Sequence, residues 1–362
     1  MIIKNAKLAD EQVIDIEIEE GIITKVGSGL MGEIIYDLEE KYYISAGWID
    51  AHSHAFDNYE FIGDDIDTIG VKAGVTTLID AGTVGSDEID KLANANDIAV
   101  TDVFSLLNIS KIGIIVQDEL SNLNNIDIEA FLASYKKYPN LIKGIKARMS
   151  GSVIGNNGML PLKLAKEIQL KTSLPLMVHI GNPDPNLDDI LKSLGRNDIL
   201  THCFHGKKSN ILDNSLETKT LLLEAIERGM SLDIGHGTSS FSYKIYKRAV
   251  DSNIKFSTIS TDIYRNNRIH GPVFNFATTI SKFLNLGMSH SEIIDKITIE
   301  PAKIYNLRDR GQIKCGLKAD FTIYEISNVE VELIDSEGDI VVSNQIFEVK
   351  NVMKNGQLVR RE

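Results

Sequence analysis

Eight short apolar segments recur through the middle of the chain, and a stretch long enough for a helix follows each of them. The segments are residues 47–52, 75–80, 103–109, 142–149, 175–180, 199–203, 230–234 and 256–262. Buried strands that alternate with helices are typical of a parallel sheet whose two faces are covered. Eight such units favour a closed (β/α)8 barrel of the TIM type, and an open doubly wound sheet is the competing arrangement.

Both ends of the chain follow a different pattern. Ile14–Ile18 alternates apolar and acidic residues and turns into Ile22–Val26, which predicts a β-hairpin with one buried face. Near the other end, Asp320–Tyr324 is a predicted strand, and Asn355-Gly356 is a predicted two-residue hairpin turn. With 362 residues, the chain has room for a barrel of roughly 250 residues and a smaller module.

The charge balance limits the possible partners. The chain carries 51 acidic and 38 basic residues, for a net charge of -13, and no block of Lys or Arg interrupts this excess. The composition therefore argues against nucleic acid or an anionic membrane surface as a partner. Solubility is a sufficient explanation of the acidic excess.

The first residues show no apolar stretch of the kind found in signal peptides, and no segment approaches the ~18 apolar residues of a membrane span. The two cysteines, Cys203 and Cys315, are too few for a disulfide framework. We therefore expect a cytoplasmic protein, with Cys203 as a buried small hydrophobe.

Histidines stand where several of these strands end. Asp50-Ala51-His52-Ser53-His54 closes the first segment, and residues i and i+2 of an extended chain point the same way. His52 and His54 can therefore present two imidazoles to one metal ion. His179 and His202 end the fifth and sixth segments, and Asp262 ends the eighth. Because the carboxyl ends of barrel strands meet at one rim, the sequence predicts a metal site there.

Lys146 ends the fourth segment and would point into this cationic site. Desolvation and like-charge repulsion both favour its neutral amine. A neutral amine can react with carbon dioxide, and the resulting carbamate has two oxygens that can bridge two metals about 3.5–4 Å apart. Lys143, three residues earlier and opposite in strand parity, is predicted to be a surface charge.

This pattern resembles the amidohydrolase superfamily. The flanking segments 21–27 and 311–320 are similar to its small β-sandwich domain. The resemblance implies a β-sandwich domain formed by residues 1–46 and 312–362, and a metal-dependent hydrolase barrel over residues 47–311. Motifs at 108–110, 146–150 and 235–237 look most like the deacetylase-type branch near dihydroorotases.

The resemblance also implies two divalent metal ions, zinc being the expected metal, although manganese and iron accept similar ligands. One ion would be held by His52, His54, Lys146 and Asp262, and the other by carboxylated Lys146, His179 and His202. A hydroxide would bridge the ions, and Asp262 would accept its proton and deliver it to the leaving group.

Other residues are candidate substrate contacts. Arg148 shares the strand parity of Lys146, and the others lie in loops after the sixth, seventh and eighth strands, namely His205, His236 and His270. Arg148 and His236, with Arg265 and Arg268 in the loop after Asp262, would put several cationic donors around the mouth, so we expect a substrate with a carboxylate near the scissile bond. Each has a structural alternative, such as a salt-bridged wall residue, a turn histidine or a solvated loop residue. His290 instead belongs to a helix start, with Ser289 as the cap and Glu292 three residues later.

The leading hypothesis is hydrolysis of a C–N bond in a small amide, N-acyl or cyclic amide substrate, and ester cleavage is chemically close. Dihydroorotase-like or adenine deaminase-like activity is the alternative. One-metal deaminases of this superfamily have a Glu three residues after the fifth-strand His, but here Asn182 follows His179. Phosphotriesterase-like enzymes resemble a barrel without β-sandwich ends. A non-catalytic scaffold is opposed by the presence of all expected ligands. A homo-oligomer is implied by the resemblance alone.

Overall fold

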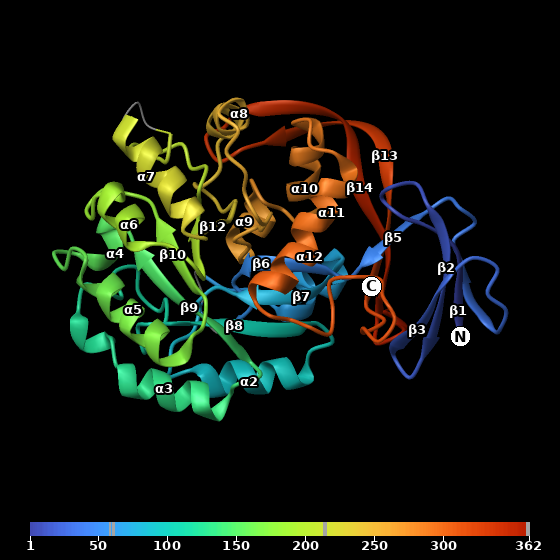
Figure 1. Cartoon of the computed structure of the whole chain (residues 1–362), viewed down its shortest axis with the longest axis horizontal. Helices are drawn as coiled ribbons and strands as arrows, with labels where there is room; N and C mark the ends of the chain where they lie inside the picture. The colour runs from blue at the N-terminus through green and yellow to red at the C-terminus, as the bar shows by residue number, and fades with distance from the viewer. Residues whose placement is uncertain (58, 60–61, 213–215, 360–362) are drawn as a thin grey trace.

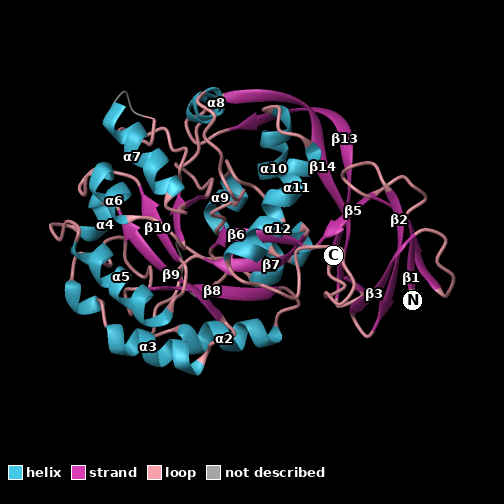
Figure 2. Ribbon diagram, in the orientation of Figure 1, coloured by secondary structure: helices cyan, strands magenta, loops and turns pink. Residues whose placement is uncertain are grey.

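The computed structural model describes residues 1–57, 59, 62–212 and 216–359, and their strands form two sheets (Figure 1). One sheet is parallel and is surrounded by helices. The other combines strands from both ends of the chain and lies beside the first (Figure 2). The fold is therefore a TIM-type barrel with a small β-domain built from both chain ends, as the sequence predicted.

The parallel sheet follows the order of the sequence, so each strand pairs with its neighbours along the chain. Its strands are β6 (Trp48–Ser53), β7 (Val75–Asp80), β8 (Asp102–Asn108), β9 (Ile142–Met149), β10 (Leu176–Ile180), β11 (Asp198–Thr201) and β12 (Ser231–Leu232). Every residue of β6, β7 and β11 is buried. Burial on both faces explains why these strands appear in the sequence as apolar runs.

The eighth segment, 256–262, closes the barrel but is not the regular strand that the sequence predicted. Isolated parallel bridges join Thr258 to Asp233 and Ile263 to Ser53. The backbone of Asp262 has a φ of 51° and donates its N–H to His52 O at 2.7 Å. A left-handed residue interrupts the regular pairing of a strand. The segment therefore occupies the eighth position as irregular backbone.

Helices cover the outside of the barrel. The α-helices are α1 (Ile66–Ile69), α2 (Ile89–Ile98), α3 (Ile128–Lys137), α4 (Gly151–Ile154), α5 (Leu160–Thr172), α6 (Leu187–Ser193), α7 (Leu216–Glu227), α8 (Tyr243–Asp251), α9 (Arg265–His270), α10 (Phe276–Asn285), α11 (His290–Ile297) and α12 (Ile299–Ile304), with 3-10 turns at Val71–Ala73 and Leu123–Asn125. The predicted capping box of Ser289 and Glu292 begins α11. Within the described residues, no helix has both the length and the apolar character that a membrane crossing requires.

The second sheet has the order β15-β14-β13-β5-β1-β2-β3, and β4 pairs with β1. Its strands are β1 (Ile2–Lys7), β2 (Val13–Glu19), β3 (Ile22–Gly27), β4 (Ile34–Asp37), β5 (Tyr43–Ala46), β13 (Phe321–Ile334), β14 (Ile340–Lys354) and β15 (Gln357–Val359). The predicted β2–β3 hairpin is present. Asn355 and Gly356 both have positive φ and join β14 to β15, as a tight two-residue turn requires. We propose the domain boundary at Gly47, between β5 and β6; residues 360–362 lie outside the described part.

The β13–β14 hairpin is much longer than the predicted strand at 320–324. Its base belongs to the small domain, and its outer half runs along the barrel beside α10 (Figure 1). The backbone N–H of Phe347 donates to Ser281 Oγ at 2.9 Å, and Asn285 Nδ2 donates to Gln345 O at 2.8 Å. We call this outer half, with its turn at residues 335–339, the hairpin arm.

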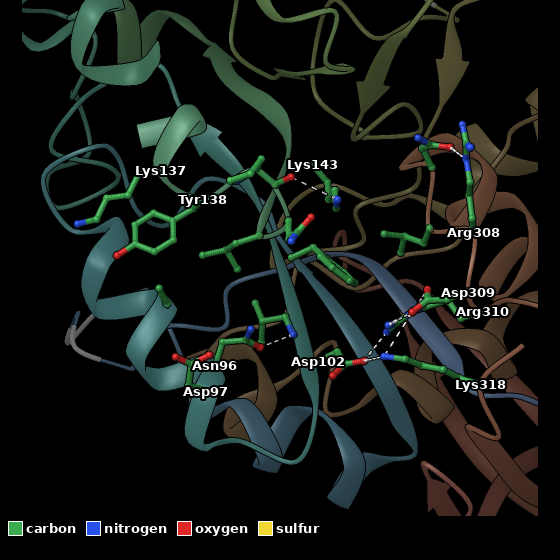
Figure 3. A pocket seen from close by; sticks show the side chains of 18 residues that line it. Asn96, Asp97, Asp102, Lys137, Tyr138, Lys143, Arg308, Asp309, Arg310 and Lys318 are labelled. Carbon is green, nitrogen blue, oxygen red and sulfur yellow. Dashed lines mark hydrogen bonds and ion pairs between the residues drawn. The ribbon is translucent and has the colours of Figure 1, made fainter. Parts of the chain in front are cut away.

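Ion pairs link the two domains at the amino-terminal end of the barrel strands. Asp102, the first residue of β8, accepts from Arg310 Nη1 at 2.6 Å and from Lys354 Nζ at 2.7 Å. A cavity of about 650 Å³ adjoins this cluster, and Lys143 and Arg308 also line it (Figure 3). Because Lys143 and Asp102 lie near the starts of their strands, this cavity is at the opposite end from the histidines.

Candidate metal centre

His52 lies in β6 and is oriented by a buried hydrogen-bond chain. Its Nδ1 contacts Thr201 Oγ1 at 2.9 Å, and the Thr201 hydroxyl donates to Asp233 Oδ2 at 2.7 Å. The imidazole Nε2 faces the barrel axis, 3.1 Å from Lys146 Nζ and 3.3 Å from Asp262 Oδ1. The chain thus fixes one ring nitrogen and leaves the other turned toward the site.

His54 follows the end of β6 and approaches the same carboxylate. Its Nδ1 contacts Thr83 Oγ1 at 2.7 Å, and its Nε2 lies 2.9 Å from Asp262 Oδ1. Burial lowers the pKa of His54 below its ordinary value, because the charged imidazolium loses its hydration. The neutral imidazole is the form that binds a metal ion.

His179 in β10 and His202 after β11 form the second pair. Nε2 of His202 lies 2.8 Å from Nδ1 of His179, and Nδ1 of His202 lies 2.7 Å from Gly235 O. Burial lowers the pKa of both imidazoles well below the ordinary value. Because a carbonyl only accepts, neutral His202 carries its proton on Nδ1, and its Nε2 is the acceptor in the contact with Nδ1 of His179.

Lys146 in β9 lies between the two histidine pairs. Its side chain is buried, and Nζ contacts Met177 Sδ at 3.2 Å in addition to His52. Burial lowers the pKa of Lys146 to about 7, although the carboxylates of Asp262 and Asp233 work in the opposite direction. The structure therefore gives this amine the desolvated surroundings that the sequence predicted.

Asp262 occupies the closing segment of the barrel, and its left-handed backbone turns the carboxylate toward His52 and His54. Burial works to raise the pKa of this carboxyl, but the two imidazoles outweigh it and hold the pKa well below the usual range. A Cβ at position 237 would overlap the Asp262 carboxylate. Gly237, with a φ of 52°, is therefore required beside this side chain.

The donor set fits a divalent metal ion. Ligand atoms of His52, His202 and Asp262 lie within 4.8 Å of one another. Imidazoles and a carboxylate that converge on one point are the ligands that zinc and similar ions take in proteins. The outer nitrogens of His52 and His202 are each held by a hydrogen-bond partner, as is usual for metal-binding histidines.

The sequence analysis missed the buried carboxylates beneath the centre. Asp233 accepts from the hydroxyls of Thr258, at 2.5 Å, and Ser260, at 2.7 Å, besides Thr201. Asp50 accepts from the backbone N–H of Thr261 at 3.0 Å. Asp50 lies in β6 and Asp233 directly follows β12, and an acidic residue inside an apolar segment is the signal that could have identified them.

Arg148 and His236 are both buried and already have partners. Arg148 Nη1 pairs with Glu119 Oε2 at 2.9 Å. Burial raises the pKa of Glu119, and the guanidinium offsets part of that rise. Lys282 Nζ lies 2.8 Å from His236 Nε2, and His236 Nδ1 lies 2.9 Å from Gly237 O. The structure thus places Arg148 in a wall salt bridge and His236 in a turn, the two structural alternatives.

The remaining candidates lie at different depths. His205 is fully buried, and neither ring nitrogen has a hydrogen-bond partner among the described residues. His270 ends α9 and is exposed. Arg268 pairs with Asp64 at 2.5 Å, and Arg265 lies 3.8 Å from the same carboxylate. The two arginines therefore neutralise Asp64 at the edge of the barrel.

A TIM-type barrel that brings four histidines, a buried lysine and an aspartate to the carboxyl ends of its strands defines a metal-dependent hydrolase. Residues 43–359 match the amidohydrolase family. The chain belongs to that family, as the resemblance predicted.

Relatives with several names share this architecture. The chain is 42% identical to a deacetylase of Enterococcus faecalis over 99% of its own length and 98% of that protein. A solved structure described as an adenine deaminase has a TM-score of 0.96 at 41% identity, with 99% of this chain and 98% of that chain covered. A structure described as a dihydroorotase has a TM-score of 0.90 at 30% identity, with 99% of this chain and 97% of that chain covered.

An adenine deaminase of Clostridium perfringens is 24% identical over 99% of this chain, which spans only 58% of that protein. The family and its members make this chain a hydrolase of C–N bonds, as predicted.

Proposed function

We propose that the enzyme hydrolyses the acyl C–N bond of a small N-acyl, amide or cyclic amide substrate, with Asp262 as the general acid and base. The observation that carries this proposal is the carboxylate of Asp262, which meets His54 at 2.9 Å and His52 at 3.3 Å on the rim of the barrel. The relative named a deacetylase supports an acyl substrate. Ester cleavage would follow the same attack on a carbonyl carbon.

The proposed ligands form two groups that share Lys146. One group is His52, His54, Lys146 and Asp262, and the other is Lys146, His179 and His202. Two divalent ions bound there, which we propose to be zinc, would activate a water molecule and polarise the substrate carbonyl. The protein itself orients the imidazoles through buried hydrogen bonds and buries four of the proposed ligands, His52, His54, Lys146 and His202.

Asp262 handles the proton in this proposal. Its lowered pKa keeps the carboxylate ionised at neutral pH, so an oxygen can accept the proton of the attacking water. A C–O bond then forms at the acyl carbon. The same proton passes to the leaving nitrogen as the C–N bond breaks, and Asp262 returns to its ionised form.

Lys146 would act as a carbamate. Its neutral amine attacks carbon dioxide, a new N–C bond forms and one proton is released. A pKa of about 7 makes the neutral amine abundant at physiological pH, whereas an exposed lysine is almost wholly protonated. The carbamate would replace a cationic group by an anionic one between the two histidine pairs.

A purine deaminase is the less favoured activity. The position three residues after His179 holds Asn182, whose backbone N–H donates to Ser150 Oγ at 3.1 Å. An amide cannot deliver a proton to a purine ring as a carboxylic acid can. The curated adenine deaminase of Clostridium perfringens is also distant in sequence and much longer.

We also propose that the substrate carries a carboxylate near the scissile bond, bound by Lys207. Arg148 and Arg268 are paired with carboxylates, but the amine of Lys207 has no hydrogen bond or ion pair among the described residues. Burial lowers its pKa, while Asp262 and Glu337 raise it, so the amine lies within electrostatic range of the proposed general base. An anionic substrate would supply the missing partner.

The test is a substrate panel on purified, metal-loaded enzyme that includes N-acyl amino acids, their neutral amides, cyclic amides, esters and adenine. We expect the acyl compounds to be hydrolysed to a carboxylic acid, which titration or mass spectrometry detects. Ammonia release from adenine without any acyl hydrolysis would overturn the proposal. Elemental analysis of the same sample measures the number of metal ions per chain.

A further inference from the structure

The turn of the hairpin arm reaches the loops at the mouth of the barrel. The backbone N–H of Tyr243 donates to Asp335 Oδ2 at 2.8 Å, and the Tyr243 hydroxyl donates to Leu333 O at 3.0 Å. A Cβ at Gly206 would collide with the side chain of Glu337. The small domain therefore contacts the barrel next to the candidate metal centre as well as at the opposite end, near Asp102.

The Gly235–Gly237 turn lies directly against three of the proposed ligands. Gly235 O accepts from His202 Nδ1 at 2.7 Å. A Cβ at Gly235 would stand 2.8 Å from the same nitrogen and 3.0 Å from His52 Nδ1, and a Cβ at Gly237 would overlap Asp262. A small displacement of this turn would therefore move His202 and Asp262 together.

Ser336 of the arm holds this turn from the outer side. Its hydroxyl proton is shared between Gly237 O at 3.1 Å and His236 O at 3.3 Å. The same oxygen accepts the N–H of Phe241 at 3.3 Å, and the Ser336 N–H donates to Phe241 O at 3.0 Å. Of these bonds, the two that the Ser336 hydroxyl donates reach the turn beside Asp262, whereas the Ser336 N–H binds Phe241.

Lys282 holds the turn from the inner side. Its Nζ donates to His236 Nε2, which leaves the imidazole proton on Nδ1, where it donates to Gly237 O at 2.9 Å. Gly237 O thus receives two hydrogen bonds, one through His236 and one from Ser336. Two separate elements, α10 and the arm, converge on one carbonyl next to Asp262.

We propose that Ser336 is a positioning residue for the centre, through which the small domain keeps the side chains of Asp262 and His202 in place. The proposal rests on the proposed function of those two side chains. Ser336 contacts neither of them directly and acts through the Gly235–Gly237 turn. In a variant that lacks the Ser336 hydroxyl, the bond from His236 is the one that remains to Gly237 O among the described residues. The turn can then move more easily relative to both ligands.

The test compares Ser336→Ala with Ser336→Thr, which retains a hydroxyl, and with Ser327→Ala. Ser327 lies in β13, the strand that leads to the turn holding Ser336, and its hydroxyl bonds Glu325 and Glu348, so its loss controls for general weakening of the hairpin. The first readout is the rate at which zinc-loaded protein loses metal to a chelator. The second is kcat and KM for the best acyl substrate.

For Ser336→Ala we expect metal loss about tenfold faster and kcat about tenfold lower, with KM nearly unchanged, because partners that orient metal ligands typically contribute 10–100-fold. Ser336→Thr should restore most of both, and Ser327→Ala should match the wild type. If Ser336→Ala loses metal and turns over substrate at the wild-type rates, this inference is overturned and the proposed function is not. A wild-type protein that binds no zinc would overturn the proposed function and this inference with it.

Discussion

Nζ of Lys146 lies 3.1 Å from Nε2 of His52, although 94 positions separate the two residues in the sequence. Both side chains are buried, so an ammonium group at this point would have lost most of its hydration. A carbamate on the same amine would instead place anionic oxygens beside the imidazole. The pair therefore makes Lys146 the sharpest test of a two-metal centre.

Lys146→Ala should lose most of the bound metal and activity, because both proposed sites share this side chain. A short carboxylic acid added to the variant should restore part of both by taking the place of the carbamate. Lys143→Ala is the matched control, since Lys143 lies in the same strand and lines the cavity at the far end of the barrel. Elemental analysis and kcat measure the effect, and full activity of untreated Lys146→Ala would refute the assignment.

Asp262→Asn should retain the fold, because the side chains are nearly isosteric, and lose the proton acceptor. General acid and base groups contribute about 10²–10⁴-fold, so kcat should fall at least that far, and weaker metal binding would add to the loss. Asp57→Asn, at an exposed position shortly after His54, should leave turnover unchanged. Wild-type turnover by Asp262→Asn would show that another group carries the proton.

Lys207→Met should discriminate between substrates according to their charge. A partly buried ion pair with a substrate carboxylate contributes about 1.5–3 kcal/mol, so kcat/KM for an N-acyl amino acid should fall about tenfold or more. The neutral amide of the same compound should be affected much less. Lys208→Met, at the adjacent exposed residue, is the control. Equal losses for both substrates would remove the basis for a carboxylate subsite at Lys207.

Lys282→Met should change how stability depends on pH. Burial lowers the pKa of Lys282 from 10.5 to about 7. Between these values the unfolded chain holds a proton on this amine that the folded chain lacks, so this group makes stability rise with pH, by at most about 1.4 kcal/mol per unit. The free energy of unfolding of the wild type, minus that of the variant, should therefore increase from pH 7 to pH 10.

Urea denaturation at several pH values measures this difference for Lys282→Met. Lys244→Met is the control, because the Lys244 side chain is exposed and its pKa is raised by Asp339. It should show no such slope in the same pH range. Parallel curves for the wild type and Lys282→Met would mean that Lys282 stays protonated in the folded protein, paired with Asp335 or another acid.

The sequence predicted the strands of the barrel because their residues are buried on both faces, which requires apolar runs whatever the details of packing. It also predicted that His52, His179 and His202 lie at the carboxyl ends of barrel strands, since strand parity and the end of an apolar run are local features. The lowered pKa of Lys146 followed from the same reasoning, because any amine at that depth loses its hydration.

Only the tertiary structure decided the partners of polar side chains. Arg148 has the parity of a substrate contact, but Glu119 takes it in a salt bridge from a loop 29 residues away. Asp262 ends an apolar segment, yet its backbone is left-handed, and that segment forms isolated bridges to Ser53 and Asp233 instead of a regular strand. Ser336 meets Gly237 across 99 residues. Such contacts depend on how distant elements pack, and the local pattern of a sequence carries no record of that packing.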